Sequence, residues 1–404
     1  MHDREVSSDR ACPASPYSSR LRWSFSTNRF SDELAALRKA GEPLLDLTIS
    51  NPTSADLAYP HAEIAQALGS IERLSYEPDP AGSIVAREAI ASYYAVRNIS
   101  VSVERILLTA STSEAYAFLF KLLCNPEDEV LIPLPSYPLF EYLASLECIR
   151  TVPYWLRYDG NWHVDFSTIE AGISRRTRAI VVVNPNNPTG SLLSSDEVIR
   201  LMDCARRHNL PVIADEVFSD YPLTPSGAPI QSLINRSEML TFSLNGLSKS
   251  AGMPQMKLGW IVVSGPAQQA EDCRNRLELI LDTYLSPGTP VQYALPKLLE
   301  IGRDLQNQIR TRIGENLSVL ESALHGSPAN VLRAEAGWSA IVHVPRTRSG
   351  EEWALALLTK HHVVVQPGYF YDLPGEAFLV VSLLTAPAPF REGIAKLREA
   401  VSLP

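Results

Sequence analysis

Residues 178–190 read RAIVVVNPNNPTG, an apolar β-branched run that leads directly into a polar, turn-rich loop. The same kind of run recurs through the middle of the chain, with helical patterns in between. Apolar runs lie at residues 105–110, 128–133, 211–215, 240–245 and 257–264, and helical patterns lie at 114–124 and 195–208. This alternation is typical of a largely parallel, doubly wound α/β sheet. We therefore predict an α/β fold whose ligands bind at the carboxyl ends of the strands.

The two ends of the chain differ from this middle part. A long helical pattern at residues 291–325 is followed by short strands and a last helical pattern at 390–402. A chain of 404 residues exceeds what one hydrophobic core usually serves. We predict an N-terminal arm that forms part of a small domain (1–50), a large domain (51–289) and a small C-terminal domain (290–404).

Composition excludes several classes of protein. The net charge is −9 without a stripe of Lys and Arg, which argues against nucleic acid as a partner. No apolar run approaches the roughly 18 residues of a membrane span, and the polar start lacks the apolar core of a signal peptide. We predict a cytoplasmic protein with no membrane partner. The cysteines are odd in number and lack CxxC spacing, so we expect reduced thiols and no metal site. They are Cys12, Cys124, Cys148, Cys204 and Cys273.

Lys249 is the strongest chemical signal. It follows an apolar strand in the stretch NGLSKSAGMPQMKLGW (residues 245–260), where small residues leave room for a bulky ligand. A lysine that is partly desolvated near another cation, such as Lys257, loses its proton more easily and can attack an aldehyde. The alternative is a solvated surface lysine.

The loop TASTSE (residues 109–114) is a second candidate site. Ser111, Thr112 and Ser113 offer hydroxyl and backbone N–H groups at the start of a helix, where the helix dipole favours a phosphate. The spacing of Ser111 and Glu114 fits a capping box equally well, and a capping box needs no ligand.

Three further side chains follow predicted strands. We expect Asn187 to end a buried strand and to offer amide donors to a phenolate-type oxygen, although a simple turn is the alternative. Asp215 closes an apolar run, and a buried carboxylate needs a partner such as a protonated heterocyclic nitrogen; it could instead cap a helix. Tyr137 could stack on a planar cofactor or pack in the core or a dimer interface.

Taken in order, these motifs resemble the aminotransferases of class I/II, which are fold-type I enzymes of the aspartate aminotransferase superfamily and use pyridoxal 5′-phosphate (PLP). The resemblance runs from ISNPT (residues 49–53) to the last helix, and NPNNPTG followed by DEV and LSK carries most of it. It implies a PLP cofactor, a large domain with a mostly parallel seven-stranded sheet, and a smaller α+β C-terminal domain. It also implies a homodimer with shared active sites.

The resemblance further implies a role for each matched residue. Lys249 would be the Schiff-base lysine and the general acid/base, Asp215 the partner of the pyridine nitrogen, and Asn187 the donor to the phenolic oxygen. Tyr137 would stack on the ring. The phosphate would be held by Ser111, Thr112, Ser113, Ser248, Lys257 and, from the other subunit, Tyr76. The implied activity is ping-pong transfer of an amino group from an amino acid or related amine to a 2-oxo acid.

Three positions depart from the pattern of the family. Lys257 replaces the usual arginine, so it brings charge to a phosphate without a planar fork. Phe218 replaces the common tyrosine and lacks its hydroxyl group. Val380, in AFLVVSLLT (residues 377–385), stands where we expect the arginine that clamps the substrate carboxylate. Arg22 and Arg29 are the candidates to replace that arginine, whereas we expect Arg391 at the surface.

Two other classes of function remain open from the sequence. The Phe218 and Val380 departures raise the prospect of another PLP reaction on the same fold, catalysed by a lyase, decarboxylase, cyclase or oxidase. A non-enzymatic PLP-sensing module is the third class. The absence of a helix-turn-helix segment before residue 50 and the presence of Lys249 argue against it. Fold resemblance favours transamination, but the site decides the reaction.

Overall fold

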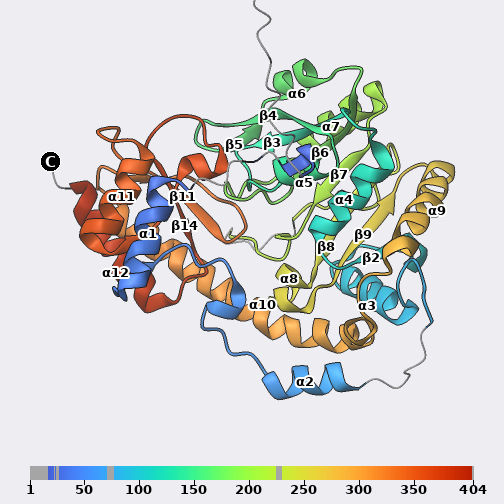
Figure 1. The fold of residues 1–404 in the computed structure, drawn as a ribbon, viewed down its shortest axis with the longest axis horizontal. Helices are drawn as coiled ribbons and strands as arrows, with labels where there is room; N and C mark the ends of the chain where they lie inside the picture. Colours follow the sequence, from blue (N-terminus) through green and yellow to red (C-terminus); the bar gives the residue numbers. More distant parts are fainter. Residues whose placement is uncertain (1–16, 22, 24–26, 71–76, 224–229, 403–404) are drawn as a thin grey trace, which may run out of the picture.

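The structure of the chain is a computed structural model. It describes residues 17–21, 23, 27–70, 77–223 and 230–402 (Figure 1). Arg22 and Tyr76, two of the candidate site residues, lie outside these ranges, as does Cys12.

A mixed sheet of eight strands forms the centre of the described part, in the order β2-β9-β8-β7-β6-β3-β4-β5. The strands are β2 Ile106–Thr109, β3 Glu129–Leu134, β4 Arg150–Tyr158, β5 Trp162–Val164, β6 Thr177–Val183, β7 Val212–Asp215, β8 Thr241–Gly246 and β9 Gly259–Ser264. The pairings β8–β7, β7–β6, β6–β3 and β3–β4 are parallel. The pairings β2–β9, β9–β8 and β4–β5 are antiparallel.

This sheet confirms the predicted α/β fold class but has one strand more than the seven predicted. The additional strand is β5, which turns back on β4 through residues 159–161. Gly160 in this turn has φ +111°, a conformation that glycine adopts without the steric cost other residues meet. The strands β2, β8 and β9 are buried along their whole length. This burial explains why they read as nearly continuous apolar runs.

Helices surround the large sheet. They are α2 His61–Gly69, α3 Ile84–Ala95, α4 Thr112–Leu123, α5 Phe140–Leu146, α6 Phe166–Gly172, α7 Ser195–His208, α8 Leu247–Ser250 and α9 Ala267–Tyr284. Two of them, α4 and α7, correspond to helical patterns predicted from the sequence. The α7 bounds equal those of the predicted helix. Ser194 and Glu197 form a capping box at its start, and Asn209 ends it in the left-handed conformation. Short 3₁₀ helices occupy Ser19–Leu21, Pro52–Ser54, Val103–Arg105, Pro254–Met256 and Gly368–Tyr371.

A second group of elements combines both ends of the chain, at the left of Figure 1. A four-stranded antiparallel sheet has the order β10-β11-β14-β13, and β1 pairs with β12. These strands are β1 Leu45–Asp46, β10 Asn330–Val331, β11 Ser339–His343, β12 Val363–Val364, β13 Gln366–Pro367 and β14 Phe378–Ser382. The helices of this group are α1 Arg29–Ala40, α11 Gly350–His361 and α12 Pro387–Ser402.

The helix α10, Thr289–Leu324, contacts both groups of elements. It packs on α2 and α3 near its start and on α12 farther along, and it runs across the lower part of Figure 1. The N-terminal residues Phe30 and Leu47 share a core with the C-terminal residues Leu379 and Phe390. The proposed domain boundaries, after residues 50 and 289, stay a prediction.

The sequence analysis also predicted that the chain has no membrane span and that its cysteines are reduced. None of the helices in the described ranges has both the length and the apolar character that crossing a membrane requires. The four cysteines within those ranges have free thiols. Of these, Cys204 and Cys273 are buried, and Cys124 and Cys148 are half-buried.

Candidate active site

Lys249 lies in α8, the single helical turn that follows the buried strand β8. Its Nζ atom is 4.6 Å from the ring centroid of Trp338 and 5.3 Å from that of Phe218. Burial lowers the pKa of Lys249 to about 8, and the nearby Asp215 carboxylate opposes this shift. A large fraction of this amine is therefore neutral slightly above neutral pH, as a nucleophilic lysine requires. The alternative of a solvated surface lysine does not describe this position.

Asp215 ends β7, which lies parallel to β8 in the sheet. Its Oδ1 atom accepts a hydrogen bond of 3.2 Å from the Val217 N–H, and its Oδ2 atom accepts one of 3.2 Å from the Tyr116 hydroxyl. Burial raises the pKa of Asp215 to about 6, whereas both hydrogen bonds and Lys249 lower it. The carboxylate is thus incompletely compensated and would be stabilised by a cationic partner.

Tyr116 is a residue that the sequence analysis missed. It is fully buried on α4, and burial together with the Asp215 charge raises the pKa of its phenol well above the usual value. The phenol therefore stays protonated and donates its hydrogen to Asp215. One signal was available, because Tyr116 lies one helical turn after Thr112 and so shares a helix face with it.

Asn187 occupies the loop after β6, and the expectation that it ends a buried strand is wrong. The strand ends at Val183, because the proline-rich loop that follows cannot continue the ladder of hydrogen bonds. The Oδ1 atom of Asn187 accepts a hydrogen bond of 3.1 Å from the Ser339 hydroxyl. Its Nδ2 amide makes no hydrogen bond to any described residue, so it is available to a ligand.

The same loop packs tightly on the segment before β11. Gly190 has φ +65°, and a Cβ atom there would lie 2.5 Å from the Ala336 carbonyl oxygen. Only glycine permits this close approach. The contact brings Trp338 and Ser339, which the sequence analysis also missed, beside Asn187 and Lys249.

Ser111 caps helix α4, but the predicted capping box is incomplete, because the Glu114 side chain does not accept from the Ser111 N–H. Its hydroxyl accepts a hydrogen bond of 3.2 Å from the Glu114 N–H. Glu114 in turn accepts hydrogen bonds from the Ala110 N–H, at 2.6 Å, and from the Ser286 hydroxyl, at 3.1 Å. The N–H groups of Thr112 and Ser113 have no partner among the described residues. They leave an anion-binding position at the start of the helix.

Ser248 lies within the lysine-bearing turn α8, and Lys257 follows it after the short 3₁₀ helix Pro254–Met256. Lys257 is exposed, has φ +53°, and lines a cavity of about 520 Å³ together with Ala110 and Ser286. Its charge is therefore close to the start of α4. Ser248 is half-buried, and its side chain makes no hydrogen bond within the described part of the chain. Its assignment to a phosphate stays a prediction.

Tyr137 follows β3 in a loop and is 51% exposed, so it is not a core residue. The backbone of this loop is held by a hydrogen bond of 3.1 Å from the Ser136 N–H to the Tyr371 carbonyl oxygen. Burial raises the pKa of Tyr371, and the nearby Tyr137 phenol adds to this shift, which places the two side chains near each other. A ring in this position is free to stack on a ligand, and that role stays a prediction.

The candidates for carboxylate binding are placed less favourably. Val380 is 1% exposed and packs in an apolar cluster with Ile341 and Tyr371, so its position carries no charge. Arg29 is exposed at the start of α1, where its described electrostatic neighbour is Glu352 of α11. Arg391 is exposed on α12, as expected.

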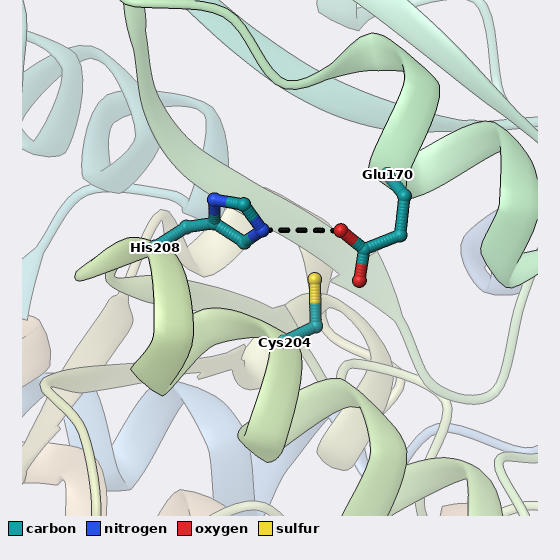
Figure 2. Close-up of side chains that lie close together, drawn as sticks. All are labelled: Glu170, Cys204 and His208. Carbon is teal, nitrogen blue, oxygen red and sulfur yellow. Dashed lines mark hydrogen bonds and ion pairs between the residues drawn. The ribbon is translucent and has the colours of Figure 1, made fainter.

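One cluster of potential metal ligands lies apart from this site, between α6 and α7 (Figure 2). Glu170, Cys204 and His208 each direct one ligand atom to a common region, within 4.8 Å of one another. Both carboxylate oxygens of Glu170 already have partners, since Arg207 pairs with Oε1 and His208 Nε2 lies 3.1 Å from Oε2. Burial raises the pKa of Cys204 to about 11, which disfavours the thiolate. The cluster is explained as an ion-pair link between two helices.

Lys249 and Asp215 lie together at the carboxyl ends of two parallel strands in a mixed sheet, which defines the chain as an α/β protein with a ligand site at that edge. Comparison with known proteins identifies the family. Residues 42–388 match the family described as aminotransferase class I and II. The chain belongs to this family.

Individual relatives agree with this assignment. The glutamate-pyruvate aminotransferase AlaA of Escherichia coli K12 is 32% identical over 272 residues, which are 66% of this chain and 66% of that enzyme, just under two thirds of its length. The alanine aminotransferase of Mycobacterium tuberculosis is 28% identical over 364 residues, 87% of this chain and 84% of the relative. These names support amino-group transfer over the lyase, decarboxylase, cyclase and oxidase reactions.

Solved structures share the fold over almost the whole chain. An aminotransferase from Escherichia coli superimposes with a TM-score of 0.81 at 25% identity, covering 96% of this chain and 98% of that one. The alanine aminotransferase from Pyrococcus furiosus gives a TM-score of 0.85 at 23% identity, covering 95% and 99%. At this identity the second likeness concerns the fold alone.

Proposed function

We propose that the chain is a PLP-dependent aminotransferase in which Lys249 binds the cofactor covalently and moves the substrate proton. The observation that carries this proposal is the pair formed by Lys249, with a pKa lowered to about 8, and Asp215, with a pKa raised to about 6, at the ends of adjacent strands. An uncharged amine beside a carboxylate that lacks a full partner suits a ligand with an aldehyde and a basic ring nitrogen.

The remaining residues fit the same cofactor. The free N–H groups of Thr112 and Ser113 at the start of α4, with the charge of Lys257 nearby, suit a phosphate. The free Nδ2 amide of Asn187 suits an acceptor such as a phenolic oxygen. PLP, when bound, supplies an aldehyde for the lysine and a ring that accepts the electrons left when a proton leaves the substrate.

The residues of the chain then have separate tasks. Lys249 would move the substrate proton, a task suited to an amine whose pKa lies near the working pH. Asp215 would stabilise a positive charge on the ring nitrogen of the cofactor, and Tyr116 keeps this carboxylate oriented through its hydrogen bond. Phe218 and Trp338 exclude water from one side of the lysine.

We propose an amino acid or related amine as donor and a 2-oxo acid as acceptor. The relatives named for glutamate, pyruvate and alanine support this substrate class. The apolar surroundings of Val380 support a carboxylate contact made elsewhere, with Arg22 and Arg29 as the proposed partners.

A homodimer in which Tyr76 reaches the other subunit's phosphate is proposed from the family resemblance, and light scattering of the purified protein tests it. The cytoplasmic location stays a prediction that cell fractionation tests.

The function is tested by supplying purified protein with PLP, a panel of amino donors and several 2-oxo acids. We expect conversion of the bound cofactor to its amino form by a donor and its recovery by a 2-oxo acid, both followed by absorbance. Lys249→Ala should lose this activity by at least about 10³-fold, because both the covalent attachment and the proton transfer depend on the amine. Release of ammonia without an amino form of the cofactor would contradict transamination.

A further inference from the structure

The helical turn that carries Lys249 is held from outside by side chains distant in sequence. α8 has only four residues, so carbonyl groups at its end need donors from elsewhere. The Lys249 carbonyl accepts hydrogen bonds from the Gly252 N–H, at 3.2 Å, and from the Tyr221 hydroxyl. The Ser250 carbonyl accepts its hydrogen bond from the side-chain amide of Gln306.

Gln306 lies on α10 and is 5% exposed. Its Nε2 atom donates to two acceptors, the Ser250 carbonyl and, at 3.1 Å, the Oδ2 atom of Asp220. An ionised carboxylate accepts hydrogen bonds and donates none, and the same is true of a carbonyl group. The opposite orientation of the amide would place its oxygen against both acceptors. Asp220 and the Ser250 carbonyl, together with Arg310, whose Nη2 donates to Gln306 Oε1 at 3.5 Å, therefore fix which way the Gln306 amide points.

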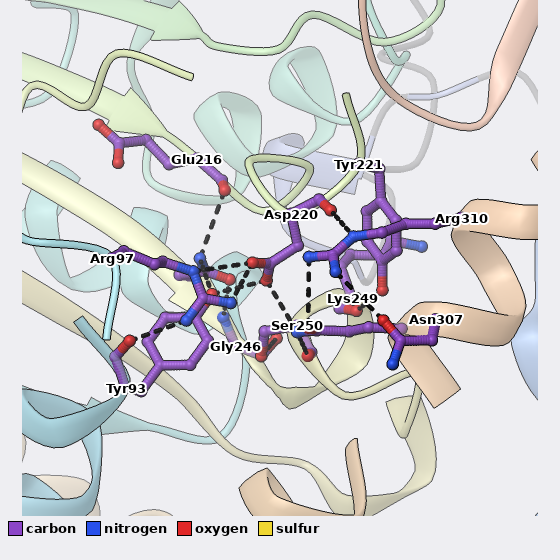
Figure 3. Close-up of polar contacts among 12 residues, drawn as sticks. Tyr93, Arg97, Glu216, Asp220, Tyr221, Gly246, Lys249, Ser250, Asn307 and Arg310 are labelled. Carbon is purple, nitrogen blue, oxygen red and sulfur yellow. Dashed lines mark hydrogen bonds and ion pairs between the residues drawn. The ribbon is translucent and has the colours of Figure 1, made fainter. Parts of the chain in front are cut away.

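Asp220 is itself immobilised by a buried network (Figure 3). Its side chain is 1% exposed and pairs with the Arg97 guanidinium. It also accepts a hydrogen bond of 2.7 Å from the Tyr93 hydroxyl, and its backbone carbonyl accepts one of 2.7 Å from Arg310 Nε. A buried carboxylate with this many donors is well satisfied, so it is a fixed point between α3 and α10.

We infer that Gln306, oriented by Asp220, is a positioning residue that holds the α8 turn so that the Lys249 amine stays against Phe218 and Trp338 and near Asp215. The inference rests on the proposed role of Lys249. Gln306 touches only the backbone of the turn, so it acts through the lysine rather than on a ligand. Because α10 also packs on α12, the position of the lysine is linked to the C-terminal helix.

Loosening of the α8 turn would expose the Lys249 amine to water. Burial is the largest cause of the lowered pKa of Lys249, so a loosened turn that admits water should raise that pKa towards its ordinary value of 10.5. A role limited to joining α8 and α10 would change the stability of the protein without moving this titration.

The test is the pH dependence with which Lys249 reacts with acetic anhydride in cofactor-free protein, read for the Lys249 peptide by mass spectrometry. Gln306→Met keeps the length of the side chain and removes both donors. We expect the titration midpoint to rise by about one pH unit or more. In the loaded enzyme, kcat should fall by at least about 10-fold, while KM for the donor changes less than about 3-fold. An unchanged midpoint in a folded variant would overturn the positioning role.

Two further variants keep the inference testable if Gln306→Met does not fold. Asp220→Asn is isosteric and removes one of the groups that orient the Gln306 amide, while the Ser250 carbonyl and Arg310 remain. A smaller upward shift is therefore expected, and no shift would overturn the orienting role of Asp220. Gln308→Met is the matched control, since Gln308 lies on the same helix but bonds only to the Ala58 backbone. It should leave the midpoint unchanged. Activity that persists in Lys249→Ala would instead overturn the proposed function, without affecting the cofactor-free titration.

Discussion

The amine of Lys249 lies 4.6 Å from the ring centroid of Trp338. Trp338 immediately precedes β11, so the C-terminal part of the chain covers a lysine that the central sheet presents. The indole ring also packs edge to face on Phe218 and Tyr221, at centroid distances of 5.3 and 5.0 Å. These contacts make Trp338 both a core residue and a wall of the candidate site.

Trp338→Ala tests both roles. We expect the free energy of unfolding to fall by about 3–5 kcal/mol, as for other buried aromatic residues, measured by urea unfolding. Water entering the vacated space should raise the pKa of Lys249 above about 8, because burial is the main cause of its lowered value. Trp338→Phe should retain most of both properties. Trp23→Ala, at a half-buried ring that contacts Tyr142, serves as the control and should change neither by much.

Asp215→Asn should change the stability of the cofactor-free protein in a pH-dependent way. Burial raises the folded-state pKa of Asp215 from 3.8 to about 6, so between these values the folded protein binds more protons than the unfolded chain. The wild-type carboxylate therefore destabilises the folded state increasingly from pH 4 to pH 7. Asparagine does not titrate, so the variant should gain about 2–3 kcal/mol relative to wild type over this range.

Urea unfolding of both proteins at pH 4 and pH 7 measures this difference. Addition of PLP should reduce or reverse the gain at pH 7, since the wild-type carboxylate then acquires a cationic partner. A stability difference that is the same at both pH values would show that Asp215 has an ordinary pKa.

Substitutions at Lys257 separate charge from geometry in phosphate binding. Lys257→Ala should weaken PLP binding by about 10-fold, equivalent to about 1.4 kcal/mol, and added salt should reduce the difference. Lys257→Arg should bind PLP within about 3-fold of wild type or more tightly, since the guanidinium adds a planar fork. Absorbance titration of cofactor-free protein measures both. Lys297→Ala, which removes an exposed lysine paired with Glu300, is the control. Equal affinities for wild type and Lys257→Ala would exclude Lys257 from the phosphate site.

The N-terminal arginines are tested with donors that have or lack a carboxylate. We expect Arg22→Gln or Arg29→Gln to raise KM for an amino-acid donor by about 10-fold, because one charge-assisted contact to its carboxylate is lost. KM for the corresponding amine, which has no carboxylate, should be nearly unchanged. Arg391→Gln, at an exposed position on α12, is the control. No change in either variant would mean that neither arginine binds the substrate carboxylate.

Much of the fold was predictable because its signals are local. The apolar runs at residues 178–184 and 240–245 correspond to β6 Thr177–Val183 and β8 Thr241–Gly246, since buried parallel strands need apolar residues on both faces. The extra strand β5 was not predicted. It has only three residues, Trp162–Val164, and forms because a short turn allows it to pair with β4. So short a run carries almost no periodic signal.

The residues of the candidate site also divide into those that the local sequence predicts and those that depend on tertiary packing. Lys249 and Asp215 were predictable from the sequence, because each directly follows or ends an apolar strand and the carboxyl ends of such strands meet at one edge of the sheet. Tyr116, Trp338 and Gln306 depended on packing. Gln306 did leave a trace, as a polar residue on the same face of α10 as the buried residues Ile309 and Ile313.

The sequence by itself therefore determined six strands of the large sheet, the helices α4, α7, α10 and α12, the family motifs and the two ionisable groups at the sheet edge, because all of these depend on residues close together in the chain. Only the tertiary structure decided the pKa of Lys249, the partner of Asp215 and the anchoring of the α8 turn by Gln306. Those properties depend on burial and on contacts between distant segments, which chain order does not specify.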